Sequence, residues 1–234
     1  MTEIKLSQRL QAIANFVPQN ARLADIGSDH AFLPTYLVQQ KKINYAVAGE
    51  VVQGPFEIAK RHVEEASLHN EIYVRKANGL AAINEQDGID TIVIAGMGGI
   101  LITEILSKDR PLLNGVSRLI LQPNNHEDTL RRWLLAHDFV ISHESILLEA
   151  GKFYEIIVAV PKKQHPELLT ELSVTEYLFG PILLTKKTAI FRQKWEKELR
   201  TLNKILAKLP QNQHQKREDL EEKKQRIEEV LSEN

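Results

Sequence analysis

Cysteine is absent from this chain of 234 residues. Its absence excludes a disulfide framework, a thiolate metal site and a cysteine nucleophile. No apolar run approaches the roughly 18 residues that a membrane-spanning helix needs, and the N-terminus MTEIKLSQRL lacks the apolar stretch of a signal peptide. These absences predict a cytoplasmic protein.

An excess of charge of either sign is also missing, since 30 Lys and Arg face 31 Asp and Glu and the net charge is -1. The whole molecule therefore has no field that attracts polyanions, and any affinity for nucleic acid must be local. Hydrophobic residues make up 43% of the chain, which is ordinary for a globular protein. A chain of this length predicts one α/β domain with an appendage.

Short β-rich runs alternate with helical stretches after an amphipathic helix near residues 6–17. Pro34 and Pro55 are expected in the first turns of two of the helices, where a missing N–H costs nothing. A third amphipathic helix is expected at residues 127–137. The runs expected as strands are residues 22–26, 45–50, 72–76, 91–95 and 118–122. This alternation predicts a parallel sheet.

Two further strands, at residues 140–148 and 154–160, are joined by only five residues. That connection is too short for a parallel crossover, so these strands are predicted to form an antiparallel hairpin. The expected fold class is therefore α/β, with a mostly parallel seven-stranded sheet that ends in an antiparallel hairpin. Class I methyltransferases have this Rossmann-like architecture, whereas most dehydrogenases do not.

Beyond Pro161 the composition shifts to polar helices, expected near residues 167–179, 186–209 and 215–231. A break at Gly180-Pro181 and a turn at residues 210–212 separate them. Leucines on one face of each of the last two helices predict an antiparallel coiled coil. We therefore expect a methyltransferase domain with its N-terminal helix at residues 1–161 and a helical coiled-coil domain at residues 162–234.

The loop at residues 25–30, Asp-Ile-Gly-Ser-Asp-His, discriminates between nucleotide cofactors. A dinucleotide fold has G-x-G-x-x-G, whose second glycine lets the backbone approach a pyrophosphate. Asp29 takes that place here, and its carboxylate would repel a pyrophosphate and attract a cation. Because S-adenosylmethionine carries a sulfonium and an ammonium group, Asp25 and Asp29 suit its methionine end, and Gly27 permits close backbone contact.

Polar residues at the ends of the next strands extend this candidate site along the carboxyl edge of the sheet, where open α/β folds bind ligands. Glu50 ends the second strand, where an acidic side chain binds ribose hydroxyls. Asn78 and Gly79 follow the third strand and are expected beside an adenine ring. Each feature alone has a structural alternative, namely a helix cap, a turn or a solvated strand end.

The fourth and fifth strands lead into the expected reactive edge. Three glycines in the four residues 96–99 indicate backbone close to a ligand, a helix N-terminus that binds one, or only a tight turn. Residues 122–124, Gln-Pro-Asn, resemble the Asn-Pro-Pro-Tyr signature of methyltransferases that modify exocyclic amines of bases, but one strand later than usual. Gln122 and Asn124 are expected to read the donor and acceptor edge of a base.

Five blocks together resemble the bacterial tRNA adenine-N1-methyltransferases that act in the D-arm. They are DIGSDHAFLP at 25–34, GEVVQGP at 49–55, ANGL at 77–80, IAGMGG at 94–99 and LQPN at 121–124. The resemblance implies a class I fold, S-adenosylmethionine as methyl donor, N1 of the adenine at position 22 of tRNA as acceptor, and a C-terminal coiled coil.

The resemblance also implies roles for individual residues. His30, at the end of the loop, is a candidate proton acceptor, base-stacking ring or polar helix cap. No spacing of His, Asp and Glu residues in the sequence predicts a metal site. The catalytic residues are expected to be Asp29, Gln122 and Asn124. The cofactor-binding residues are expected to be Asp25, Gly27, Ser28, Asp29, His30, Glu50, Val51, Asn78, Gly79, Gly96, Met97 and Gly98.

The first long C-terminal helix, near residues 186–209, is rich in Lys and Arg and is predicted to contact tRNA, with Lys194 and Arg200 among the contacts. A coiled coil that serves only structure or oligomerisation is the alternative, and the oligomeric state stays open. Other functions compatible with the sequence are a methyltransferase for a small molecule or protein, a non-catalytic RNA-binding scaffold, and a nicotinamide oxidoreductase, which Asp29 disfavours.

Overall fold

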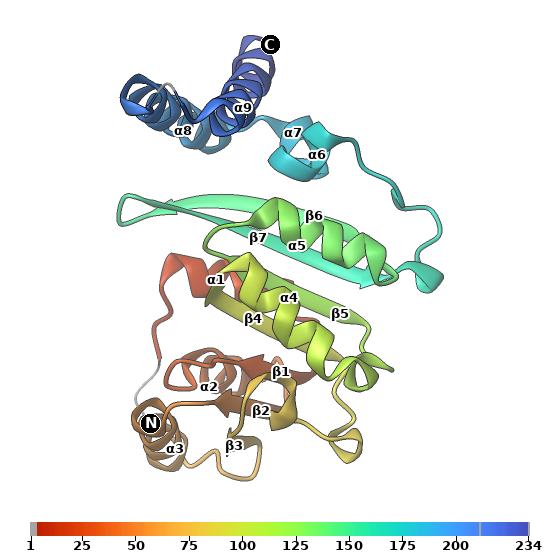
Figure 1. Ribbon diagram of the computed structural model, residues 1–234. Helices are drawn as coiled ribbons and strands as arrows, with labels where there is room; N and C mark the ends of the chain where they lie inside the picture. The colour runs from red at the N-terminus through yellow and green to blue at the C-terminus, as the bar shows by residue number, and fades with distance from the viewer. Residues whose placement is uncertain (1–3, 211, 234) are drawn as a thin grey trace.

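One seven-stranded sheet, in the order β3-β2-β1-β4-β5-β7-β6, forms the centre of the computed structural model, which describes residues 4–210 and 212–233 (Figure 1). The first five strands pair in parallel, and β7 runs antiparallel to both β5 and β6. The predicted fold class is confirmed. The strands are β1 (Arg22–Ile26), β2 (Tyr45–Glu50), β3 (Ile72–Lys76), β4 (Thr91–Met97), β5 (Arg118–Pro123), β6 (Phe139–Glu149) and β7 (Lys152–Pro161).

The terminal hairpin is longer and its turn is tighter than the sequence predicted. Glu149 pairs with Lys152, so Ala150 and Gly151 alone connect the strands. Both residues have positive φ, 49° and 75°. Because this two-residue turn projects the strands further than the five-residue loop we expected, the hairpin extends beyond the rest of the sheet (Figure 1).

Apolar cores lie on both faces of the sheet, because successive side chains of a strand point to opposite faces. Leu23 of β1 belongs to the core under α1, α2 and α3, whereas Ala24 belongs to the core under α4 and α5. The helices of this part are α1 (Gln8–Phe16), α2 (Phe32–Gln39), α3 (Gln53–Glu65), α4 (Gly99–Lys108), α5 (Glu127–Ala136) and the 3-10 turns η1 (Gly79–Ala82), η2 (Glu85–Asp87) and η3 (Arg110–Leu113).

Gly99 begins α4 where the loop before α5 passes close to it. Its N–H donates to the Asn125 carbonyl at 2.9 Å, and a Cβ at this position would lie 2.3 Å from the His126 carbonyl oxygen. The third glycine of the glycine-rich run therefore serves packing between backbone segments.

Replacing Gly99 with alanine should lower the free energy of unfolding by about 1–3 kcal/mol, because backbone must shift to admit the methyl group. Urea unfolding measures this change. Gly54→Ala in α3 is the matched control, since its Cβ would meet nothing within 4 Å. Equal unfolding free energies for the two variants would contradict this account of Gly99.

The C-terminal part forms its own apolar core, centred on Phe179, Phe191, Trp195, Leu202 and Ile227, and Ile146 of β6 packs against it. The two long helices predicted to form an antiparallel pair are present and pack together, although Gln211 of the expected turn lies outside the described residues. The elements are η4 (Lys162–Gln164), α6 (Val174–Phe179), α7 (Pro181–Lys186), α8 (Ala189–Lys208) and α9 (His214–Ser232).

The helix predicted near residues 167–179 is wrong in its first half. It begins only at Val174, because the Ser173 side chain accepts from the Glu176 N–H and the Glu176 carboxylate accepts from the Ser173 N–H. This capping box defines a helix start that the apolar pattern alone did not locate.

A buried charge network joins the sheet to the C-terminal helices. Arg131 of α5 is fully buried and donates to Glu144 of β6 at 2.8 Å and to Glu155 of β7 at 2.5 Å. Lys194 of α8 donates to the second oxygen of Glu155 at 2.6 Å and to Glu127 at 2.7 Å. Burial alone would raise the pKa of Glu155, but Lys194 and Arg131 hold that pKa below its usual value.

The predicted division of the chain into two domains at residue 161 stays a prediction.

Candidate cofactor and acceptor site

A pocket of about 330 Å³, called here the cofactor pocket, lies at the carboxyl ends of β1, β2 and β4. The structure brings together seven of the residues predicted for cofactor binding, and α1 and α3 complete the walls. The lining residues are Arg9, Leu10, Asp25, Gly27, Ser28, Asp29, Glu50, Pro55, Ala95, Gly96 and Met97.

The loop after β1 is held in an unusual conformation. Gly27 has φ of 70°, and a Cβ there would lie 2.1 Å from the Met97 side chain. Asp29, His30 and Ala31 also have positive φ, a conformation that non-glycine residues rarely adopt. Such backbone persists only where neighbouring contacts impose it, and here the Glu50 carboxylate accepts from the Asp29 N–H at 2.6 Å. Glu50 therefore shapes the loop as well as the pocket.

Three carboxylates make the cofactor pocket acidic. Asp25 is only 4% exposed and accepts from the Ser28 hydroxyl at 2.5 Å. Burial raises the pKa of Asp25 to about 7, the Ser28 hydrogen bond opposes this rise, and the nearby Glu50 adds to it. Burial also raises the pKa of Glu50. The Asp29 side chain is 78% exposed. A cation of suitable size would relieve the mutual repulsion of these groups.

Other residues predicted for cofactor binding do not line this pocket. Asn78 is exposed after β3, Gly79 is buried at the start of η1, and Val51 is exposed. Gly98 is the N-cap residue of α4. The His30 ring packs against Phe32 and His62 instead. Their roles stay predictions.

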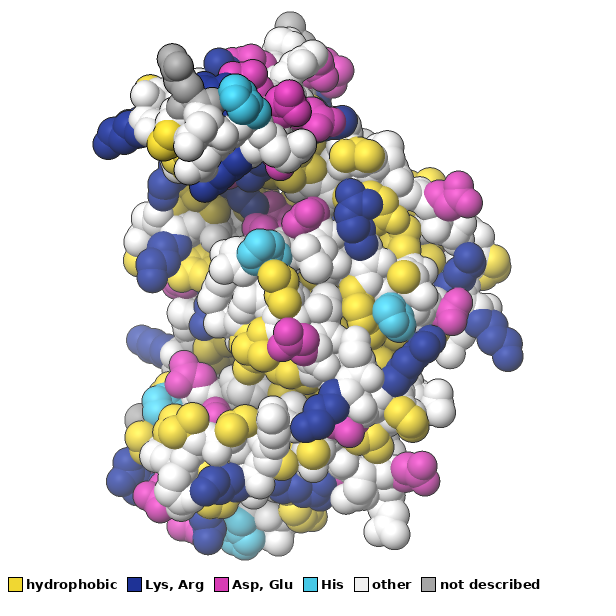
Figure 2. Space-filling view, viewed as in Figure 1, with side chains coloured by type: hydrophobic (Ala, Val, Ile, Leu, Met, Phe, Trp, Pro, Cys, Tyr) yellow, Lys and Arg dark blue, Asp and Glu magenta, His cyan; other side chains and the backbone are white. Residues whose placement is uncertain are grey.

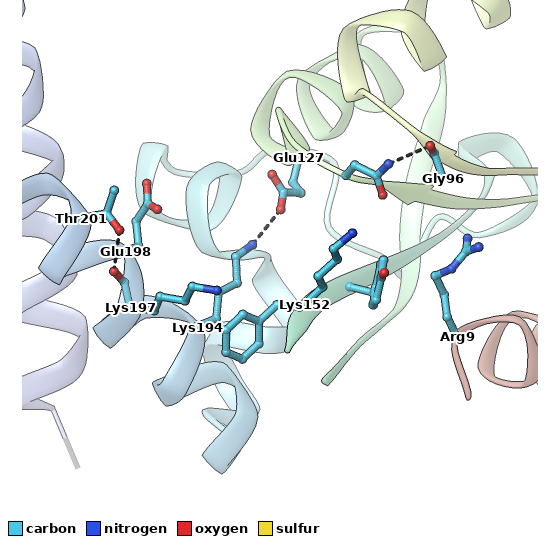
Figure 3. A pocket seen from close by; sticks show the side chains of 11 residues that line it. Arg9, Gly96, Glu127, Lys152, Lys194, Lys197, Glu198 and Thr201 are labelled. Carbon is cyan, nitrogen blue, oxygen red and sulfur yellow. Dashed lines mark hydrogen bonds and ion pairs between the residues drawn. The ribbon is translucent and has the colours of Figure 1, made fainter. Parts of the chain in front are cut away.

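A second and larger pocket, of about 550 Å³, opens between the sheet edge and α8 and is called here the acceptor cleft (Figure 3). Arg9 and Gly96 line both pockets, so the two adjoin. Side chains from α1, β7 and α8 point into the cleft (Figure 3). Its lining residues are Arg9, Gly96, Asn124, Glu127, Lys152, Phe153, Tyr154, Lys194, Lys197, Glu198 and Thr201.

Gln122 organises the wall of the acceptor cleft from beneath. Its Oε1 accepts from Arg9 at 2.8 Å and from the Gly96 N–H at 3.1 Å, and its Nε2 donates to Asn124 Oδ1 at 3.0 Å. Because Gln122 is fully buried and both ends of its amide have protein partners, this arrangement does not present it to a base. Asn124 is exposed, lines the cleft and donates to the Gly96 carbonyl at 2.7 Å.

The sequence reasoning missed several residues of the cleft. The hairpin turn is followed by Lys152, Phe153 and Tyr154. A basic residue beside two aromatic residues is typical of sites that bind single-stranded nucleic acid. This combination of residues could have been recognised in the sequence. The position of Arg9 could not, because the periodic pattern of its helix concerns only the apolar face.

The basic side chains of α8 differ in their exposure and in their partners. The prediction that Lys194 contacts tRNA is not supported, because Lys194 is only 18% exposed and binds Glu127 and Glu155. Arg192 donates to the carbonyls of Leu231 and Glu233. Lys197 is exposed on the cleft and lies over the Phe153 ring. The Arg200 side chain is 66% exposed and forms a long ion pair with Glu196 at 4.0 Å. Figure 2 shows dark blue Lys and Arg side chains where the surface is hollowed beneath the C-terminal helices.

Among residues 4–210 and 212–233, no group of His, Asp and Glu is placed to hold a metal ion. No helix there is both long and apolar enough to span a membrane.

A Rossmann-like sheet that ends in an antiparallel hairpin, with an acidic pocket at its carboxyl edge, defines a class I S-adenosylmethionine-dependent methyltransferase. The sequence model of the family described as "TrmK: tRNA (adenine(22)-N(1))-methyltransferase" matches residues 23–232, and the chain belongs to this family. The tRNA (adenine(22)-N(1))-methyltransferase of Bacillus subtilis (strain 168) is 42% identical over 230 residues, which cover 98% of this chain and 94% of that protein.

Solved structures agree with the assignment. A candidate tRNA (m1A22) methyltransferase of Streptococcus pneumoniae, in complex with S-adenosyl-L-methionine, has a TM-score of 0.89 and 48% identity, over 97% of this chain and 100% of that chain. TrmK of M. capricolum, in complex with S-adenosyl-homocysteine, has a TM-score of 0.86 and 31% identity, over 97% of each chain.

Proposed function

We propose that this chain transfers the methyl group of S-adenosylmethionine to N1 of the adenine at position 22 of tRNA. The observation that carries the proposal is membership of the TrmK family over residues 23–232, joined to an acidic pocket and a basic cleft that adjoin at Gly96. The first pocket suits a cationic methyl donor and the second suits a nucleotide.

The cofactor pocket fits S-adenosylmethionine in charge and shape. Asp25 and Asp29 would attract the ammonium and sulfonium groups, and Glu50 ends β2 where it can accept from ribose hydroxyls. Gly27 lets the loop pack directly against Met97, because a Cβ at this position would collide with the Met97 side chain. Asn78 and Gly79 follow β3 at the same edge of the sheet, and they stay our candidates for contacts with the adenine ring.

The acceptor cleft would hold the target adenine after it leaves its stack in the tRNA. Phe153 and Tyr154 offer aromatic faces for stacking, and Lys152 and Lys197 offer positive charge for phosphates. Asn124 lies where the two pockets adjoin and is our candidate for the contact with the base edge. Gln122 acts as a positioning residue, because it holds Arg9 and Asn124 and is itself buried.

The chemistry needs orientation more than proton transfer. S-adenosylmethionine supplies an electrophilic methyl group on a sulfonium, and the adenine N1 lone pair forms the new N–CH3 bond as the S–CH3 bond breaks. The electron pair returns to sulfur, and the positive charge passes to the adenine ring. Because N1 carries no proton, no general base is required, and the chain contributes alignment and electrostatics.

The direct test is incubation of the purified protein with labelled S-adenosylmethionine and unmodified bacterial tRNA, followed by digestion and mass identification of the methylated nucleoside. We expect 1-methyladenosine, and its loss when the adenine at position 22 is replaced in a transcript. A different labelled nucleoside, or label on protein or a small molecule instead, would overturn the proposal.

Binding of tRNA should depend on Lys197, which faces the acceptor cleft and has no ion pair within the described residues. Lys197→Glu should weaken tRNA affinity about tenfold and reduce the slope of log affinity against log salt by about 1, as expected for loss of one phosphate contact. Affinity for S-adenosylmethionine should not change. Lys60→Glu, at an exposed position of α3, is the matched control, and equal effects of both variants would refute a role for the cleft.

A further inference from the structure

The two adjoining pockets carry opposite charge. Asp25, Asp29 and Glu50 line the cofactor pocket. In the acceptor cleft, Glu127 is paired with Lys194 and Glu198 with Lys223, whereas the structure gives Arg9, Lys152 and Lys197 no ion pair within residues 4–210 and 212–233. The acceptor side therefore has a net positive charge.

Arg9 stands at the boundary, because it lines both pockets. Its position is determined by several contacts. The Glu149 carboxylate accepts from the backbone N–H groups of Gln8 and Arg9 at 2.7 and 3.2 Å, which ties the start of α1 to the hairpin. The guanidinium donates to Gln122 at 2.8 Å and lies 5.5 Å from the centre of the Tyr154 ring.

Methyl transfer moves one positive charge across this boundary. Before transfer the charge is a sulfonium beside three carboxylates, and afterwards it is a methylated adenine on the side of Arg9. Two like charges a few ångströms apart repel at the effective dielectric constant of a protein surface, and they repel less once salt screens them. A neutral adenine is not subject to this repulsion.

We propose that Arg9 is a specificity-determining residue that makes the acceptor cleft select against the methylated product base. The proposal rests on the proposed function, since it requires N1 of adenine as the acceptor atom. In this role Arg9 does more than attract RNA in general. It lowers the affinity for tRNA that already carries the methyl group, so unmodified tRNA is retained and methylated tRNA is released. Asp29, which the sequence predicts to be a catalytic residue, lines the cofactor side of this boundary.

The test compares the affinities of two tRNAs that differ only at position 22, one with adenosine and one with 1-methyladenosine introduced by chemical synthesis and ligation. Binding is measured near pH 7 without cofactor, so that no turnover is needed. Wild type should prefer the unmodified tRNA by about tenfold. Arg9→Gln should bring this ratio close to 1, whereas Arg9→Lys, which keeps the charge, should retain most of it.

Arg110→Gln is the matched control, because Arg110 is exposed in η3, lines neither pocket and pairs loosely with Asp138. It should keep the ratio of wild type. An unchanged ratio in Arg9→Gln, or no preference in wild type, would overturn the role of Arg9. The methylation assay of wild type on the unmodified tRNA is read separately, and failure there would refute the proposed function whatever the binding ratio.

Discussion

Replacement of Arg131 with methionine should lower the free energy of unfolding by about 3–5 kcal/mol, because it leaves two buried carboxylates without their common partner. Arg131 and Glu144 are fully buried, and Glu155 is 1% exposed. Burial raises the pKa of Glu144 even with Arg131 beside it, which shows how unfavourable its ionised form would become alone. Methionine fills much of the volume, so the loss would be electrostatic.

Urea unfolding at neutral pH measures this effect, and Arg132→Met provides the control. Arg132 is the next residue of α5, is exposed, and lies 4.1 Å from the centre of the Tyr177 ring, so its loss should cost about 1 kcal/mol or less. Because Glu155 also binds Lys194 of α8, we expect Arg131→Met to loosen the C-terminal helices as well. Similar losses in the two variants would show that the network contributes no net stability.

The affinity for S-adenosylmethionine should rise from pH 6 to pH 8 and should depend on Asp25. Burial raises the pKa of Asp25 to about 7, so its carboxylate is largely protonated at pH 6 and largely ionised at pH 8. Only the ionised form attracts a cation. Asp25→Asn should therefore cost about 100-fold in affinity at pH 8, as for a buried charge pair a few ångströms apart, and much less at pH 6.

Without cofactor the same group acts on stability in the opposite sense. A raised pKa means that the protonated form stabilises the fold, and this contribution is complete below the ordinary pKa of 3.8 and is lost as the pH rises through about 7. Calorimetric titration with S-adenosylmethionine at both pH values measures the affinities of wild type, Asp25→Asn and the exposed control Asp138→Asn. A pH-independent affinity in wild type would contradict the prediction, as would equal affinities of wild type and Asp25→Asn at pH 8.

Much of the fold was predictable because it depends on local periodicity. Three of the predicted strands have the observed bounds, and β4, β5 and both hairpin strands differ only at their ends. The hairpin was predictable from the length of its connection. Residues 167–173 were wrongly expected to be helical, because polar helical sequence has little periodicity and the helix start is set by the capping box at Ser173.

The candidate site was predictable only in part. Asp25, Gly27, Ser28, Asp29 and Glu50 follow consecutive strands, so the parallel topology alone brings them to one pocket. Gln122 and Asn124 were both expected at the base. Only the packing distinguishes them, because a buried amide with protein partners and an exposed one have the same sequence signal.

The amino-acid sequence alone was sufficient for the class I fold and the family, because these follow from the alternation of strands and helices and from short motifs. The tertiary structure alone decided which side chains line the acceptor cleft. Arg9, Lys152 and Lys197 come from α1, β7 and α8, elements that no local pattern links. They meet because the Glu149 cap holds α1 to the hairpin and the buried Arg131 network, through Glu155 and Lys194, holds α8 to the sheet.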